Sequence, residues 1–286
     1  MKSKNNKLSY NPYTPSRRFM MRQDFSVINT KKPKKSLLKK INKISGRDSF
    51  GKISIHHRGG GHKRKYRIIS SLQDFIDTPA TVKTIEYDPN RTARIMLVQL
   101  DNNMVKYLLA PDKIKIGDKI ICSDNAKLAT GNRLKLKNIL TGTEIYDIEI
   151  TPNSRGRLVR SAGSSAIVLS QQEGNSKKSN YIQIKLPSGE IRLIHKECYA
   201  SIGKVSNTLH STIKIGKAGR KRWMGIRPTV RGKAKNPCDH PHGGGEGGSP
   251  IGLKYPKTAT GKHALGKITR RNKRTNKFII KRRFKK

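Results

Sequence analysis

The chain has 286 residues, with 63 lysines and arginines against 18 aspartates and glutamates, and a formal charge of +45 at pH 7. A compact body with this charge would repel itself, so the composition excludes a free-standing globular protein and favours a polyanionic partner. Residues 1–67 and 201–286 carry 20 and 24 basic side chains against 2 acidic ones each, whereas residues 68–150 carry 11 of each. Two cationic arms therefore flank a centre that has enough Ile, Val, Leu and Tyr to fold.

The first 67 residues predict an extended basic arm. Residues 36–44 have the spacing of one or two turns of amphipathic helix. The arm ends in residues 56–67, where Gly59, Gly60 and Gly61 let the backbone bend closely among basic side chains. A flexible linker is the alternative, but plain Gly/Ser linkers lack the interleaved histidine and tyrosine of this stretch.

From about Thr81 the sequence changes to short strands separated by turns. Asp88-Pro89-Asn90-Arg91 and Asp101-Asn102-Asn103 have turn composition. Short strands at this spacing indicate a small antiparallel barrel. The expected strands are residues 81–87, 93–100, 104–109 and 119–122.

The same pattern returns beyond a join expected near residues 125–140. Pro187-Ser188-Gly189 predicts a hairpin turn between two strands of this second barrel. Residues 154–163 add a basic rim that contains glycine. The expected strands are residues 144–150, 166–169, 180–186 and 190–194.

From about Ser201 glycine and positive charge dominate again. Trp223, the one tryptophan of the chain, follows three consecutive cations. It is expected either in a core or stacked on a nucleobase or on Arg222. Residues 267–286 hold 11 basic side chains and no acid, which predicts a tail that is disordered in isolation.

The most unusual stretch is residues 236–248, with two histidines, two acids and five glycines. Its prolines fix φ and its glycines allow close approaches, so it predicts a shaped loop laid against nucleic acid. General-base catalysis by His240 lacks a nucleophile and an orienting partner. A zinc site formed by Cys238, His240 and His242, with Glu246 as a further candidate ligand, is also disfavoured, because the alternating residues are joined through a proline and are badly placed for tetrahedral coordination.

Seven strings in the sequence closely resemble motifs of the large-subunit ribosomal protein L-two family, one of the universal ribosomal protein families. They occur in the order of the family and span most of residues 50–286. The strings are HHRGGGHKRKY at 56–66, EYDPNR at 86–91, RSAG at 160–163, LPSGEIR at 186–192, AGRKRW at 218–223, RPTVRG at 227–232 and NPCDHPHGGGEG at 236–247.

The resemblance implies a mainly β fold, with an oligonucleotide-binding-like β-barrel followed by an SH3-like β-barrel and with long, basic, extended N- and C-terminal arms. We accordingly divide the chain into four parts. These are a basic N-terminal arm at 1–67, an RNA-binding oligonucleotide-binding-like barrel at 68–130, an SH3-like barrel at 131–202, and a basic glycine-rich C-terminal extension at 203–286 with loop 236–248 and the tail.

The resemblance also implies a structural constituent of the large ribosomal subunit and not an enzyme. The expected partners are large-subunit rRNA, neighbouring ribosomal proteins, the small subunit across the intersubunit face, and nearby tRNA. The loop at 239–247 is expected to reach toward the peptidyl-transferase region, where rRNA carries the reaction. No protein-bound cofactor or metal is expected, and any Mg²⁺ at the interface would be associated with the rRNA.

The residues expected to bind RNA combine phosphate-binding cations with glycines and polar groups of the shaped loops. Lysine and arginine displace counterions from phosphates, and arginine adds planar bidentate and stacking contacts. The expected residues are Arg58, Gly59, Gly60, Gly61, His62, Lys63, Arg64, Arg67, Arg155, Arg157, Arg160, Arg220, Arg222, Trp223, Arg227, Arg231, Asn236, Asp239, His240, His242, Gly243, Gly244, Gly245 and Glu246.

The chain departs from the family pattern at three places. The family commonly has Val where Cys238 stands and often Arg where Gly248 stands, and it usually has a Pro-Trp-Gly near residues 258–261, where the tryptophan is missing here. The last departure leaves the packing beyond the loop open.

Two other function classes fit less well. A nucleic-acid chaperone or DNA-compacting protein explains the arms but not two patterned barrels. An enzyme acting on RNA needs carboxylates or histidines clustered in a pocket, whereas the acids of 68–150 lie mostly at strand ends and turns.

The compartment is inferred from composition. Three widely separated cysteines favour a reducing compartment, and no run approaches the roughly 18 apolar residues of a membrane span. The bias to 40 lysines and 12 alanines suggests an AT-rich coding genome. It favours a mitochondrial ribosome in the matrix, with a plastid ribosome or the bacterial cytoplasm as alternatives.

Overall fold

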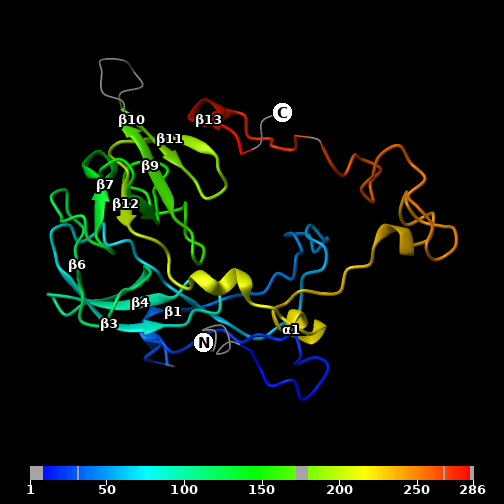
Figure 1. Ribbon diagram of the computed structural model, residues 1–286, viewed down its shortest axis with the longest axis horizontal. Coiled ribbons are helices and arrows are strands. Elements are labelled where there is room, and N and C mark those ends of the chain that lie inside the picture. The colour runs from blue at the N-terminus through cyan, green and yellow to red at the C-terminus, as the bar shows by residue number, and fades with distance from the viewer. Residues whose placement is uncertain (1–8, 31, 172–179, 267, 284–286) are drawn as a thin grey trace, which may run out of the picture. The chain divides into compact units, whose positions relative to one another are not determined.

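The computed structural model describes residues 9–30, 32–171, 180–266 and 268–283 (Figure 1). The chain forms two compact units. Residues 1–42, 63–216 and 275–286 make up the first, called the body here. Residues 43–62 and 217–274 make up the second, called the basic unit.

The N-terminal segment of the body contains a small sheet where the sequence predicted a helix. Strand β1 (Leu38–Lys40) pairs antiparallel with β2 (Lys65–Arg67). A 3-10 turn at Lys35–Leu37 is all the helix that residues 36–44 contain. The helix prediction was therefore wrong, because pairing with the distant β2 satisfies the backbone that a short amphipathic helix would have satisfied alone.

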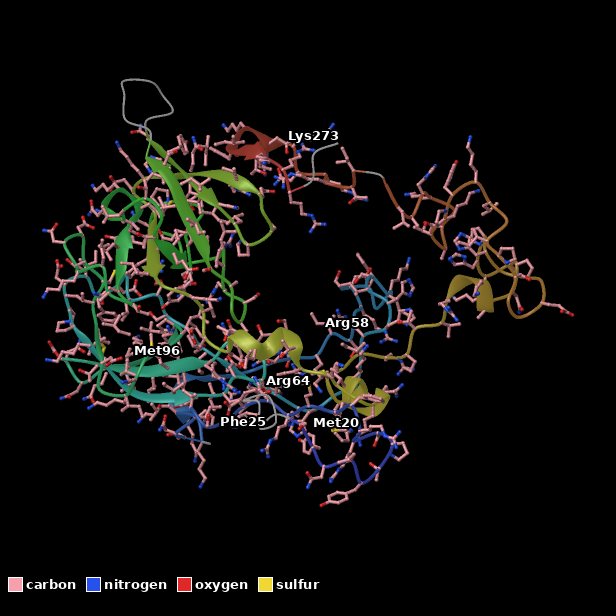
Figure 2. All side chains as sticks on the ribbon, viewed as in Figure 1. Met20, Phe25, Arg58, Arg64, Met96 and Lys273 are labelled. Atoms are coloured by element: carbon pink, nitrogen blue, oxygen red, sulfur yellow. The ribbon has the colours of Figure 1, made fainter. Side chains whose placement is uncertain are left out.

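A four-stranded sheet of order β5-β4-β3-β6 follows. Apolar side chains from its strands build one core cluster, in which Val82, Met96 and Val98 are almost fully buried. Figure 2 labels Met96 at this sheet. All four strands predicted between residues 81 and 122 are confirmed, with bounds that differ by at most two residues at either end. The strands are β3 (Ala80–Glu86), β4 (Ile95–Leu100), β5 (Val105–Leu109) and β6 (Lys119–Ile120).

A seven-stranded sheet of order β13-β11-β10-β9-β8-β12-β7 forms the second barrel. The predicted hairpin is present, with Tyr181 opposite His195 and Lys185 opposite Ile191. The sequence prediction missed β7, β12 and β13. The strands are β7 (Arg133–Lys135), β8 (Glu144–Tyr146), β9 (Ala166–Gln171), β10 (Tyr181–Lys185), β11 (Ile191–His195), β12 (Tyr199–Ile202) and β13 (Ile279–Lys281).

One predicted strand ends earlier than expected. Residues 144–150 alternate in polarity, but β8 stops at Tyr146, because Asp147 adopts a left-handed φ of 48°. Beyond it, Ile148 makes an isolated bridge with Leu158. The chain turns there toward the basic rim at 154–163.

The end of the chain is more ordered than the charge run predicted. Strand β13 pairs antiparallel with the edge strand β11, and the Phe278 ring lies 5.6 Å from that of Tyr181. The apolar triplet Phe278-Ile279-Ile280 interrupts the run of cations, and its side chains favour pairing with β11. A 3-10 turn at Arg274–Phe278 and β13 therefore give this part of the tail a regular structure that the charge run did not indicate.

A cluster of buried charge lies within the second barrel. Arg133 donates to the Asp147 carbonyl oxygen at 2.9 Å and to Ser201 Oγ at 3.2 Å, and its Nη2 lies 3.5 Å from Glu149 Oε1. Burial raises the pKa of Glu149, and the Tyr199 amide and Arg133 oppose that rise. Such a cluster is costly to desolvate and strongly destabilising to break.

The described structure is mainly β, with two curled sheets in the predicted order, so the prediction of an oligonucleotide-binding-like barrel followed by an SH3-like barrel is confirmed. Cys122 and Cys198 lie in the cores of the two barrels, where burial raises the pKa of their thiols to about 11 and about 12. The four-part division of the chain stays a prediction.

Candidate nucleic-acid interface

The basic unit has very little of its own core. None of its described residues is buried, and it carries 20 basic side chains against 3 acidic ones. Hydrophobic burial therefore contributes little to its shape. Backbone hydrogen bonds, glycine turns and a few contacts between side chains and backbone determine the local structure.

The one α-helix of the described chain is α1 (Ala218–Trp223), which carries Arg220, Arg222 and Trp223. It ends in a Schellman motif, in which the Ile226 amide donates to the Lys221 carbonyl and the Gly225 amide to the Arg222 carbonyl. Gly225 has the φ of +87° that this motif requires. The basic residues in the last turn also complement the partial negative charge of the helix C-terminus.

The segment at 57–62 pairs with the segment that follows α1. The Gly59 amide donates to the Gly225 carbonyl at 3.0 Å and the His62 amide to the Trp223 carbonyl at 2.9 Å. Arg58 and Ile226 form an antiparallel bridge, and Figure 2 shows the position of Arg58. The two motifs HHRGGGHKRKY and AGRKRW therefore form one local structure, although they lie far apart in the sequence.

Glycine is required at this pairing. A Cβ on Gly61 would lie 2.6 Å from the Gly225 nitrogen and 2.9 Å from the Trp223 carbonyl oxygen. Lys43, which sequence reasoning did not select, donates from Nζ to the Gly60 and Gly61 carbonyls at 3.2 and 2.7 Å. The close approach of two backbones, expected against RNA, is here made within the protein itself.

Trp223 does not belong to a core. It is 61% exposed, and the Lys217 ammonium lies 5.0 Å from the centroid of its ring. The indole borders an open cleft of about 570 Å³. This cleft, called the Trp223 cleft, is lined by Gly59, Gly60, Gly61, His62, Arg222, Trp223 and Arg227.

Loop 236–248 has a defined shape. The Asn236 carbonyl accepts the amides of Asp239 and His240, and the Gly243 amide donates to the His240 carbonyl at 2.8 Å. A Cβ on Gly243 would lie 2.2 Å from the Asn236 carbonyl oxygen. Gly244 and Gly245 have φ values of +91° and +79°. The prediction of a shaped loop is confirmed, and Glu246 continues it by accepting from Ser249.

Both histidines of the loop accept hydrogen bonds from the backbone. The His242 amide donates to His240 Nδ1 at 3.0 Å, and the Lys257 amide donates to His242 Nε2 at 2.8 Å. Partial desolvation, with His242 and Lys235 nearby, lowers the pKa of His240. Within the described residues, no three His, Cys, Asp or Glu side chains are arranged to hold a metal ion.

The departures from the family pattern leave the loop intact. A Cβ on Gly248 meets no atom within 4 Å, so a side chain fits at this position. Downstream, Thr258 holds a tight turn, since its amide donates to the Lys262 carbonyl at 2.7 Å and its Oγ1 accepts the Lys262 amide at 3.2 Å. Tyr255 stacks on His263 across this turn.

The basic rim of the body presents two exposed arginines. Arg155 and Arg157 flank the buried Gly156, whose Cβ would lie 2.4 Å from Asp147 Oδ1. The glycine therefore lets the chain sit against Asp147 while both guanidinium groups face solvent. Arg160 is held differently, with its Nε 3.0 Å from Asp147 Oδ1 and its Nη1 donating to the Gly156 carbonyl.

The other predicted cations of the body are partly used internally. Arg64 donates to the Pro89 carbonyl at 2.9 Å, and Figure 2 marks its place. Arg67 is buried on β2 and donates to the Lys65 carbonyl at 2.9 Å. Lys63 is exposed at the start of this segment. Arg67 and Arg160 therefore have structural roles in the protein that their sequence motifs did not reveal.

The structure brings some predicted site residues together and leaves others apart. Residues 59–62 line the Trp223 cleft together with Arg222 and Arg227, whereas Arg231 and loop 236–248 form a separate local structure in which Gly232 packs on the His240 ring. Sequence reasoning missed Lys43, Lys217, Gly225 and Lys257. Only Gly225 gave a signal, as a glycine placed to end a helix.

These features define a class of protein: two small β-barrels that carry a basic, glycine-rich unit without its own core, as expected of a protein that binds folded RNA. The chain matches the family "Ribosomal Proteins L2, RNA binding N-terminal domain" over residues 34–122 and "Ribosomal Proteins L2, C-terminal domain" over residues 129–261. It therefore belongs to the ribosomal protein L2 family, as the sequence motifs indicated. It is a structural, RNA-binding protein of the large ribosomal subunit.

No helix in the described part of the chain combines the length and the apolar character that crossing a bilayer requires.

Proposed function

We propose that this protein binds large-subunit rRNA through its basic unit and body rim, and that it supports subunit association, tRNA binding and the architecture of the peptidyl-transferase region. The observation that carries the proposal is the composition of the basic unit, with 20 cations, 3 acids and no buried described residue. A unit of this kind is stabilised when a polyanion neutralises it.

The RNA contacts are proposed to be of two kinds. Exposed guanidinium groups, such as those of Arg155, Arg157 and Arg222, bind phosphates. Loops at 59–61 and 236–248 place backbone groups against sugars and phosphates. Arg67 and Arg160 act indirectly, because their internal contacts hold the segments that carry exposed neighbours.

Loop 236–248 is proposed to reach toward the peptidyl-transferase region as a structural element. His240 and His242 each accept a backbone amide, so one ring nitrogen of each is engaged in shaping the loop. We propose hydrogen bonding to RNA for the groups that remain, and no protein-bound cofactor or metal. The Mg²⁺ expected there is associated with the rRNA, and the chemistry of peptide-bond formation belongs to the rRNA.

The proposed partners are large-subunit rRNA, neighbouring ribosomal proteins, the small subunit and tRNA. The proposed location is the mitochondrial ribosome of the matrix, with a plastid ribosome or the bacterial cytoplasm as alternatives. Composition alone supports the location, through the ratio of 40 lysines to 12 alanines. Fractionation of cells that express the tagged protein distinguishes the three.

Sedimentation of the tagged protein from cell extract, with and without ribonuclease, tests the proposal. We expect comigration with large-subunit RNA and loss of that comigration after ribonuclease treatment. Migration as a free or DNA-bound species would overturn the proposal and favour a nucleic-acid chaperone.

A variant that lacks loop 236–248 separates assembly from later function. We expect it to enter large-subunit particles, because the body keeps its own cores. Those particles should join small subunits poorly and form peptide bonds slowly. Normal joining and normal peptide-bond formation would contradict the role proposed for the loop.

A further inference from the structure

The Trp223 cleft has the size and chemistry of a ligand site, which the proposed phosphate contacts do not explain. Its volume of about 570 Å³ falls in the range of about 300–1,000 Å³ that is typical of small-molecule sites. Its lining contains one indole, two guanidinium groups, an imidazole and three glycines, and no carboxylate. This set suits a flat aromatic group that carries a negative charge.

The indole is held in place and still accessible. The Trp223 carbonyl accepts the His62 amide at 2.9 Å, and α1 ends directly at this residue in its Schellman motif. Trp223 nevertheless keeps 61% of its surface exposed. Lys217 occupies a place over the ring at 5.0 Å, and a cation on one face leaves the other face for a planar partner.

The opposite wall is backbone. Gly60 has a φ of +64° and a Cβ there would meet no atom within 4 Å, so this residue faces open space. The carbonyls of Gly60 and Gly61 point to Lys43 Nζ, which turns the acceptors of this wall toward a cation. This wall of the cleft therefore presents little negative potential that would repel an incoming phosphate.

We propose that the Trp223 cleft binds one unpaired nucleotide of the RNA, with its base stacked on Trp223 and its phosphate held by Arg222 and Arg227. The inference rests on the proposed function and adds a ligand class to it. Paired helix offers phosphates but no free base face, so phosphate binding alone leaves the exposed indole without a role. Base stacking on an aromatic side chain tolerates any base.

Trp223 is the only tryptophan among the 286 residues, so its fluorescence reports on this cleft directly. The probes are an RNA hairpin with one bulged adenosine, the same hairpin fully paired, and free AMP. Each is titrated into the full chain at fixed salt. Hairpins with bulged guanosine, cytidine or uridine complete the series.

We expect the bulged hairpin to quench Trp223 to saturation and to bind about 5- to 150-fold more tightly than the paired hairpin. Trp223→Ala, which removes the fluorescent reporter and is therefore followed, like Trp223→Phe, by the anisotropy of end-labelled hairpins, should lower the affinity for the bulged hairpin to that for the paired one. Trp223→Phe should retain part of the preference. The exposed position of Trp223 means that neither change removes a core contact.

A second variant tests the wall of the cleft. Gly61→Ala places a Cβ against the backbone of Gly225, whereas Gly51→Ala has the same left-handed φ and meets no atom within 4 Å. We expect only the first to lose the preference for the bulged hairpin. Gly51→Ala controls for backbone strain.

The outcomes separate the two levels of the proposal. Equal binding and equal quenching by bulged and paired hairpins would overturn the nucleotide site while RNA binding stands. Saturable binding of AMP as tight as that of the bulged hairpin would overturn it in favour of a free-nucleotide site. Binding of no RNA at all would overturn the proposed function as well.

Discussion

The body and the basic unit are held together by different physics. Three clusters of buried apolar residues and an ionic network around Arg133 stabilise the body. No described residue of the basic unit is buried, and its order comes from hydrogen bonds and glycine conformations. The first is stable because it excludes water, whereas the second has a shape that becomes stable when its charge is neutralised.

The largest expected effect is a loss of folding stability that is confined to the body. Arg133→Met removes one of the two cations beside Asp147 and leaves the buried Glu149 carboxylate without a cationic partner. We expect the free energy of unfolding to fall by about 3–5 kcal/mol. Urea denaturation followed by circular dichroism measures it, with the exposed Arg157→Met as the matched control. An equal loss in both variants would contradict the role of the buried network.

A smaller effect is expected from a substitution that distorts the basic unit and leaves the stability of the body unchanged. Gly243→Ala places a Cβ 2.2 Å from the Asn236 carbonyl oxygen, and overpacking of this kind costs about 1–3 kcal/mol. We expect particles that contain the variant to join small subunits less well, with an unchanged unfolding midpoint of the body. Gly247→Ala, whose Cβ meets nothing within 4 Å, is the control. Equal subunit joining by particles that contain the two variants would count against a shaped loop.

The salt dependence of RNA binding tests whether the exposed arginines at the rim of the body bind phosphates. Arg155→Ala and Arg157→Ala each remove an exposed guanidinium group without touching a core. We expect each to weaken RNA binding and to reduce the slope of log K against log salt by about 0.7–0.9. Binding titrations at several salt concentrations measure this slope. A slope that both variants leave unchanged would exclude phosphate contacts at the rim.

The smallest expected effect is the pH response of loop 236–248. The lowered pKa of His240 means that the folded loop favours the neutral imidazole, which accepts the His242 amide. Its contribution to loop stability is therefore present above the unfolded pKa of about 6.5 and is lost as the pH falls toward the folded value. An NMR titration of the His240 ring, assigned with His240→Gln, should give a midpoint below that of an unstructured histidine. A midpoint at or above that of an unstructured histidine would contradict the lowered pKa of His240.

Sequence periodicity predicted the strands of the first barrel and the hairpin of the second, because alternating burial and turn residues are local signals. Strands β7, β12 and β13 are short, and their pairing depends on distant partners, which no window of sequence contains. The helix expected at 36–44 failed for the same reason, since β2 decides the conformation of β1.

The site was predictable as a set of residue types and less so as a geometry. The glycine-rich motifs indicated close backbone approach, but the partner of Gly61 is Gly225 of the same chain. Trp223 was open between a core and a surface role until its exposure settled the matter. Lys43 and Lys217 are set apart only by their tertiary contacts. The sequence holds 40 lysines, and nothing in the composition distinguishes these two from the others.

The pairing of β13 with β11 makes residues 217–274 a tethered loop with both ends on the body. Without that pairing the segment would be a free end with many more conformations to lose on binding. Closing such a loop costs entropy that grows only with the logarithm of its length, so doubling the segment adds only about 0.6 kcal/mol. The three-residue strand therefore allows the tethered segment to accept insertions cheaply, which leaves its length free to change while its attachment stays fixed.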